Sequence, residues 1–159
     1  MYKRKKFNLK NYYENDCPAK MVVTFFLQGQ GYKCTGSPYC SEYASDIICY
    51  NRLGECQFHE MSRTKKWVDD FPYTTIYQPA YKKKYVEEAM RDERKPKTFF
   101  WVMSYNFDKA YVISGQTLLN TPVKRVHFHN SPASGEDFCF IDFDKAKFFD
   151  LSDYVKGVL

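Results

Sequence analysis

The chain has 159 residues, of which 44% are hydrophobic and 19% aromatic, with 14 tyrosines and 14 phenylalanines. This length and composition predict a single folded domain with one continuous core and exclude a disordered chain. The formal net charge is +5, and the basic residues form clusters that favour a phosphate-rich partner; the clusters lie at residues 3–6, 63–66, 82–84 and 94–97.

The first half of the chain predicts a helix followed by a hairpin. Apolar residues at helical spacing and Pro18 in the first turn predict a helix over about 17–29. The glycines of QGQG at 28–31 end it. Strands are expected at about 45–50 and 55–62, joined by a tight turn, because both runs are short and apolar.

The second half predicts another helix and several strands. The pattern from Pro79 predicts a helix over about 79–93, and the apolar run at 98–105 predicts a central strand covered on both faces. Further strands are expected in AYVIS, VKRVHFH and FCFIDF, and a short last helix in LSDYVK. The expected fold class is therefore α/β (α+β), a central mixed β-sheet flanked by helices.

The position of the hairpin's turn determines which side chains share a face. If residues 52–54 form a three-residue loop closed by a left-handed Gly54, then Asn51 pairs with Glu55 and Asp46 lies opposite Glu60. A two- or four-residue turn would instead place Asp46 opposite His59. In the first register the two carboxylates are cross-strand neighbours that repel each other unless a cation lies between them. Mg²⁺ or Mn²⁺ suits such oxygen ligands.

The residues SDII at 45–48 and HEMS at 59–62 give the chain a resemblance to the PD-(D/E)XK nuclease superfamily. The resemblance implies a single nuclease-like domain with a restriction-endonuclease-like core at about 14–105 and a C-terminal strand extension at about 106–159. It also implies that Asp46 and Glu60 bind the metal and that the residue two beyond Glu60 helps to activate water.

One position departs from that family. Ser62 stands where the family usually has its active-site lysine, and serine brings no positive charge. Either a nearby cation replaces that charge, with Lys65, Lys66 and Arg63 as candidates, or the site is weak or inactive. The family often uses an acid from its first helix as a further metal ligand, and Glu14 is the candidate here.

The sequence thus predicts a Mg²⁺- or Mn²⁺-dependent nuclease that acts on nucleic acid, with DNA favoured over RNA. Its catalytic residues would be Asp46, Glu60 and Ser62 with Lys65 or Lys66. The expected phosphate contacts are Arg63, Lys65, Lys66, Lys82 and Lys83. The alternative is a catalytically inactive protein of the same fold that binds nucleic acid or a protein partner, and a homodimer is compatible with either.

The surroundings of the protein are also predicted from the sequence. The longest apolar run, residues 99–103, is too short to cross a bilayer, and no apolar stretch of signal-peptide length follows the basic N-terminus. Six cysteines without a C-x-x-C pair are typical of small buried side chains in a reducing compartment. We therefore expect a cytoplasmic protein without a membrane partner, in which residues 1–10 are flexible.

Overall fold

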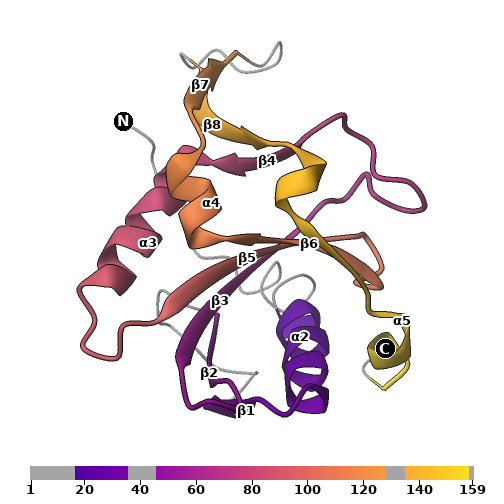
Figure 1. The fold of residues 1–159 in the computed structure, drawn as a ribbon. Coiled ribbons are helices and arrows are strands. Elements are labelled where there is room, and N and C mark those ends of the chain that lie inside the picture. The colour runs from indigo at the N-terminus through magenta and orange to yellow at the C-terminus, as the bar shows by residue number, and fades with distance from the viewer. Residues whose placement is uncertain (1–16, 36–45, 128–134, 158–159) are drawn as a thin grey trace.

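The computed structural model describes residues 17–35, 46–127 and 135–157, and Figure 1 shows their arrangement. In chain order the elements are α2 (Cys17–Gly29), β1 (Lys33–Thr35), β2 (Ile47–Tyr50), β3 (Cys56–Arg63), β4 (Ile76–Pro79), the 3-10 helix η2 (Ala80–Lys82), α3 (Lys83–Met90), β5 (Lys97–Met103), β6 (Lys109–Ser114), α4 (Gly115–Asn120), β7 (Val123–Val126), β8 (Glu136–Ile141), the 3-10 helix η3 (Phe143–Lys145), β9 (Lys147–Asp150) and α5 (Ser152–Val155).

A central sheet of six strands organises the fold. Its order is β1-β2-β3-β5-β6-β9, and a smaller sheet has the order β4-β8-β7. β3 and β5 are parallel and joined through α3, whereas the other neighbours in the central sheet are antiparallel. In Figure 1 the helix α2 lies on one side of this sheet, and α3, α4 and the smaller sheet lie on the other. The predicted mixed sheet flanked by helices is confirmed.

The helix α2 packs one face on the central sheet. It spans Cys17–Gly29, which are the predicted bounds, and it buries Val22, Val23 and Leu27. The chain then leaves the helix through Gly31, whose φ of +87° is a conformation that favours glycine. The amide of the next residue, Tyr32, donates to the carbonyl of Leu27 over 3.0 Å and closes the helix end.

β5 is the central strand that its sequence predicts. Trp101 and Met103 enter the core beneath α2, whereas Phe100 and Val102 enter the core on the opposite face, beneath α3, α4 and the smaller sheet. Consecutive side chains of a strand point to opposite faces, so a run that is apolar throughout requires cover on both. The two cores therefore share β5 as their common wall.

The second predicted helix is shorter than expected. Pro79 ends β4 opposite Phe138 instead of starting the helix, and α3 stops at Met90 rather than near 93. The Asp92 carboxylate accepts a hydrogen bond from the Arg94 amide over 2.9 Å, which replaces the helical backbone bond. Four short elements of the described residues were not predicted, namely β4, α4, η3 and β9, which have four, six, three and four residues.

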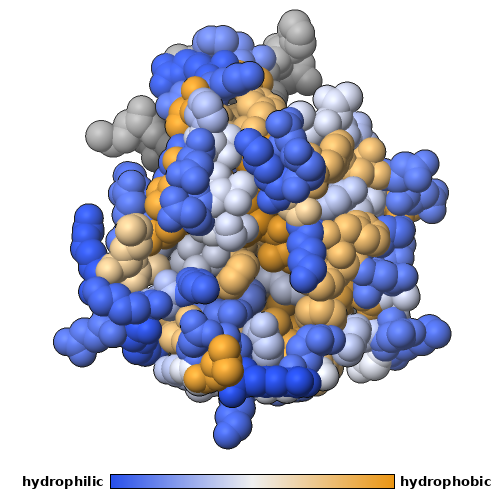
Figure 2. Space-filling model, viewed as in Figure 1, coloured by the Kyte–Doolittle hydropathy of each residue, from blue (hydrophilic) through white to orange (hydrophobic). Residues whose placement is uncertain are grey.

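The surface is mostly polar with a few apolar patches. Figure 2 shows hydrophilic side chains over much of the visible face, with smaller apolar areas between them. Phe143 and Phe148, in η3 and β9, are among the exposed apolar residues. Within the described ranges, no helix has the length and apolar character needed to cross a membrane.

Candidate active site

The loop of the β2–β3 hairpin has the predicted three-residue form. The Asn51 amide donates to the Glu55 carbonyl over 3.0 Å, and the Gly54 amide donates to the Asn51 carbonyl over 2.9 Å. Gly54 has a φ of +79°. The Asn51 side-chain oxygen accepts from the amides of Leu53 and Glu55, which fixes the loop further.

This loop sets the register of the hairpin. Tyr50 pairs with Cys56, Ile48 with Phe58, and Ile47 with His59. Asp46 precedes β2 and Glu60 follows His59 on β3, so the two acids are the next residue on each strand beyond the last printed pair. The predicted register is confirmed, and the register that would pair Asp46 with His59 is excluded.

Asp46 is held by two groups. One carboxylate oxygen, Oδ2, accepts a hydrogen bond from the Met61 amide over 2.8 Å. The other, Oδ1, lies 3.8 Å from Nζ of Lys20, a residue of α2 that is only 1% exposed. Burial raises the pKa of Asp46, and the Met61 amide and the charges of Lys20 and Lys82 oppose that rise. A lysine that the sequence did not point to therefore supplies a positive charge beside this carboxylate.

Lys82 is a second cation near Asp46. It lies at the end of η2 and is 7% exposed. Its Nζ lies 5.9 Å from the centre of the Phe100 ring. Its positive charge acts to lower the pKa of Asp46. The sequence suggested Lys82 as a surface contact for phosphate, but the structure places its side chain inside the protein, between the central sheet and β4.

A cavity of about 220 Å³ adjoins this region, and Ser62, Arg63, Gln78 and Lys82 are among its lining residues. Gln78, on β4, is 2% exposed, and its Oε1 has no hydrogen-bond partner among the described residues. A buried acceptor without a donor is costly, so a water or ligand donor is expected in the cavity. The sequence did not single out Gln78. The one pattern that bears on it is the short stretch IYQ before Pro79, which forms β4.

The other predicted site residues are distributed as follows. Ser62 Oγ donates to the Trp101 carbonyl over 3.3 Å, and Arg63 Nε donates to the Tyr105 carbonyl over 2.8 Å. Lys83 donates to the carbonyls of Leu119 and Thr121, near the C-terminal end of α4. Two residues, Lys65 and Lys66, are exposed in the turn after β3 and do not line the cavity.

Glu14 and residues 1–10 lie outside the described residues, and their predicted roles stay predictions. The structure thus brings Ser62, Arg63 and Lys82 to one cavity, and neither Asp46 nor Glu60 is among the residues that line it.

The carboxylate oxygens of these residues are of the type that binds a hard divalent cation. Asp46 and Glu60 provide carboxylate oxygens, the ligands that Mg²⁺ and Mn²⁺ prefer. In the ranges that the structure describes, no three His, Cys, Asp or Glu side chains gather as a metal site. An ion here would therefore take two carboxylates and complete its shell with water or backbone oxygens, in competition with Lys20.

Comparison with models of known protein families gave no match, and comparison with curated proteins gave no significant match.

Proposed function

We propose that this chain is a metal-dependent nuclease that hydrolyses phosphodiester bonds of nucleic acid. The observation that supports the proposal best is the hairpin register, which pairs Ile47 with His59 and leaves Asp46 and Glu60 as the next residue on each strand. Ser62, two residues further on the same face of β3, lines a cavity that also holds a buried lysine and a buried acceptor without a donor. Carboxylates, a cation and a water-sized space are what phosphodiester hydrolysis requires.

Each side chain has a role in this proposal. Asp46 and Glu60 would hold Mg²⁺ or Mn²⁺, which would polarise the phosphate and lower the pKa of a bound water. Lys82 supplies the positive charge that Ser62 lacks, in the cavity that Ser62 lines. Gln78 Oε1 accepts a hydrogen bond from water and so orients it.

The substrate side of the proposal depends on the basic surface. Lys65 and Lys66 are exposed immediately after β3, where they can contact backbone phosphates without reading bases. DNA is the first substrate to test, and RNA is the comparison. Cytoplasmic location belongs to the same proposal.

The second candidate is a nucleic-acid-binding protein without catalysis. Both oxygens of Asp46 already have partners in the fold, the Met61 amide and Lys20, and Ser62 stands in place of a lysine. If Lys20 replaces the metal permanently, the carboxylates serve stability and only the basic surface acts on the nucleic acid.

The substitution Glu60→Gln distinguishes these candidates. Cleavage of labelled single- and double-stranded DNA and RNA is measured with Mg²⁺ or Mn²⁺, beside binding in EDTA. We expect Glu60→Gln to reduce cleavage to background while binding stays within about twofold, because phosphate contacts come from other residues. Glu87→Gln, on the exposed face of α3, is the matched control and should cleave like the parent.

Other outcomes contradict the proposal. Cleavage that survives Glu60→Gln would place the chemistry elsewhere in the chain. Binding by the parent without cleavage of any of the four substrates would establish the binding protein instead. Neither binding nor cleavage would overturn both candidates and leave a protein-binding accessory role.

A further inference from the structure

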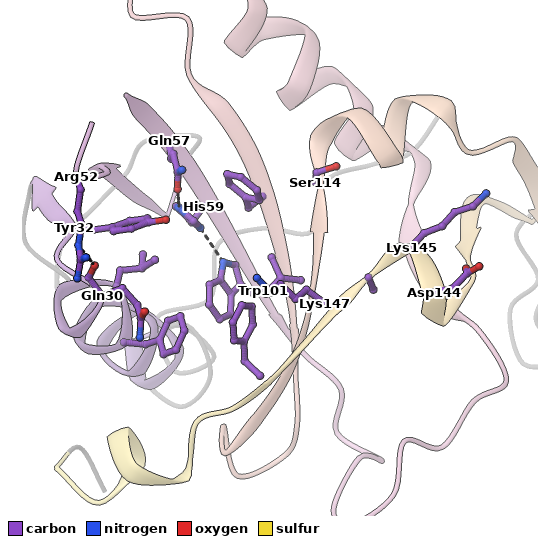
Figure 3. A pocket seen from close by; sticks show the side chains of 16 residues that line it. Gln30, Tyr32, Arg52, Gln57, His59, Trp101, Ser114, Asp144, Lys145 and Lys147 are labelled. Carbon is purple, nitrogen blue, oxygen red and sulfur yellow. Dashed lines mark hydrogen bonds between the residues drawn. The ribbon is translucent and has the colours of Figure 1, made fainter. Parts of the chain in front are cut away.

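A second, larger pocket lies on the opposite face of the central sheet. It has a volume of about 670 Å³ and is lined by residues of α2, β3, β5, β6 and β9 and by Tyr32 and Arg52. Its β3 residues are Gln57 and His59, whereas Glu60 and Ser62 point to the other face because strand side chains alternate. Figure 3 shows Tyr32 and Arg52 on one side of the pocket, Lys147 beside Trp101 in the middle, and Lys145 with Asp144 on the far side.

A chain of buried hydrogen bonds forms one wall of this pocket. Trp101 Nε1 donates to Nδ1 of His59 over 2.9 Å, and Nε2 of His59 lies 3.0 Å from Oε1 of Gln57. Because Nδ1 accepts, the proton of the neutral ring is on Nε2 and is donated to Gln57. Burial lowers the pKa of His59 to about 3, so the ring is neutral at physiological pH. Figure 3 shows this chain in the wall of the pocket.

These hydrogen bonds leave the NH₂ group of Gln57 as a donor for a ligand. Oε1 of Gln57 also faces the Cys49 thiol at 4.0 Å, so the carbonyl end of the amide is fixed by its neighbours. Among the described residues, nothing accepts a hydrogen bond from the NH₂ group of Gln57, although the side chain is only 7% exposed. The pocket thus contains a fixed donor that a carbonyl or ring nitrogen of a ligand can satisfy.

The rest of the lining is flat and aromatic. Trp101 and Phe149 are stacked with their ring centres 5.6 Å apart, and His59 and Phe99 are stacked at 5.1 Å. Phe149, Phe99 and Tyr32 are half-buried and so expose part of their rings. Such faces bind planar heterocycles by stacking, whatever the identity of the base.

The rim of the pocket is basic. Arg52 uses Nε to donate to the Gln30 carbonyl over 3.0 Å, which leaves its terminal nitrogens available. Lys145 and Lys147 also line the pocket, and Asp144 is the single acid among the lining residues. Neither Arg52 nor Lys147 forms an ion pair with a residue that the structure describes. A ligand that carries a phosphate would find uncompensated positive charge there.

We propose that this pocket binds one nucleotide unit, with its base stacked on the aromatic lining and hydrogen-bonded by Gln57 and with its phosphate at Arg52. The volume lies within the range of about 300–1,000 Å³ typical of small-ligand sites. An anionic alkyl ligand would satisfy the basic rim but would leave the Gln57 donor unpaired, so a base fits better. The site is separate from the proposed nuclease centre, because none of Asp46, Glu60 and Ser62 is among the residues that line this pocket.

The test measures binding of the four 5′-ribonucleoside monophosphates, one at a time, by calorimetry and by fluorescence of Trp101, which lines the pocket. We expect saturable binding of at least one of them. Arg52→Ala should weaken it about tenfold, the usual effect of losing a charged hydrogen bond, and should not change binding of the matching nucleoside. Arg91→Ala, an exposed arginine at the end of α3, is the matched control and should bind like the parent.

Further variants locate the ligand and identify its source. Gln57→Leu should weaken the binding of nucleotide and of nucleoside alike. The circular dichroism and melting curve of this variant show whether it is folded. If that variant unfolds, Lys147→Ala combined with Arg52→Ala tests the rim alone and should abolish measurable binding. A free nucleotide is the natural ligand if mononucleotides bind at least as tightly as a four-residue oligonucleotide, whereas tighter binding of the oligonucleotide identifies a base within a strand.

Three results would overturn the proposal. They are no saturable binding of any nucleotide or oligonucleotide at millimolar concentration, equal affinity for an alkyl phosphate, and loss of binding in Asp46→Asn. The last would place the ligand at the carboxylates and not in this pocket. Asp46→Asn with intact nucleotide binding but no nuclease activity would separate this site from the proposed function.

Discussion

The ammonium group of Lys20 lies 3.8 Å from Oδ1 of Asp46, with the lysine side chain 2% and the aspartate side chain 26% exposed. Lys20 comes from the buried face of α2 and Asp46 from the residue before β2. The pair therefore connects the helix to the hairpin that carries the candidate active site. It also provides a positive charge beside the Asp46 carboxylate in the absence of a metal.

Lys20→Met should destabilise the protein by about 1–3 kcal/mol in urea unfolding, because it leaves a largely buried carboxylate without its cation. Asp46→Asn in the same chain should recover part of that loss, since the orphaned charge is then removed. A coupling free energy below about 0.5 kcal/mol in the double-mutant cycle would show that the two side chains do not interact significantly.

Mg²⁺ or Mn²⁺ at millimolar concentration should raise the melting temperature, because an ion that binds only the native state stabilises it by mass action. Lys20→Met should enlarge the shift, since it removes the competing cation. Asp46→Asn should abolish it, with Asp153→Asn, an exposed acid in α5, as the control. A melting temperature that neither ion changes, in the parent and in Lys20→Met, would contradict a metal site.

The local features of this fold could be predicted from the sequence. Gly54 was the one residue of the hairpin loop suited to a left-handed conformation, and this predicted both the loop and the register of β2 against β3. The apolar run of β5 required cover on both faces, which implied a central strand. Both inferences rest on residues close together in the chain, where backbone geometry and strand alternation leave few alternatives.

The parts that depend on distant contacts could not be predicted. Lys20 falls among the apolar residues of α2, and its burial depends on Asp46, 26 positions later in the numbering. The contact between His59 and Trp101 exists because β3 and β5 are parallel neighbours. Gln78 lies on a four-residue strand that is defined by its pairing with β8. A sequence pattern does not indicate how two strands that are far apart in the chain pair with each other.

Lys82→Met should reduce the cleavage rate with little change in affinity for nucleic acid, because Lys82 is buried beside Ser62 and cannot act as a surface contact. Ser62→Lys in that background should restore part of the rate, since it returns the charge to the same cavity. Lys65→Ala and Lys66→Ala should instead weaken affinity and reduce its salt dependence. Equal cleavage by Lys82→Met and the parent would exclude Lys82 from the chemistry.

Gly54→Ala should cost about 1 kcal/mol of unfolding free energy. An added Cβ meets no atom within 4 Å at this position, so the cost would come from the φ of +79° alone. Gly54→Asn should cost less, because asparagine tolerates this conformation better. If Gly54→Ala were as stable as the parent, the loop would have another form and the register of Asp46 would be in doubt.

His59 should make the protein less stable as the pH falls below about 6.5. Burial lowers the pKa of the folded-state ring to about 3, whereas the ring in the unfolded chain titrates near its ordinary value of about 6.5. Between these two values the unfolded state binds a proton that the folded state does not, so unfolding becomes easier as the pH decreases. At pH above about 6.5 both states are neutral and the contribution to the pH dependence vanishes.

The slope of this loss is at most about 1.4 kcal/mol per pH unit for a single group, and it is measured by urea unfolding between pH 6.5 and 5, above the range where most carboxylates titrate. His59→Gln should flatten the slope, and His127→Gln, an exposed histidine after β7, should not. Asp46 has a raised pKa and acts in the opposite direction, but it is present in every variant and cancels in the comparison. Equal slopes for the parent and His59→Gln would mean that His59 is protonated in the folded protein, and the hydrogen bond from Trp101 to Nδ1 would then not exist.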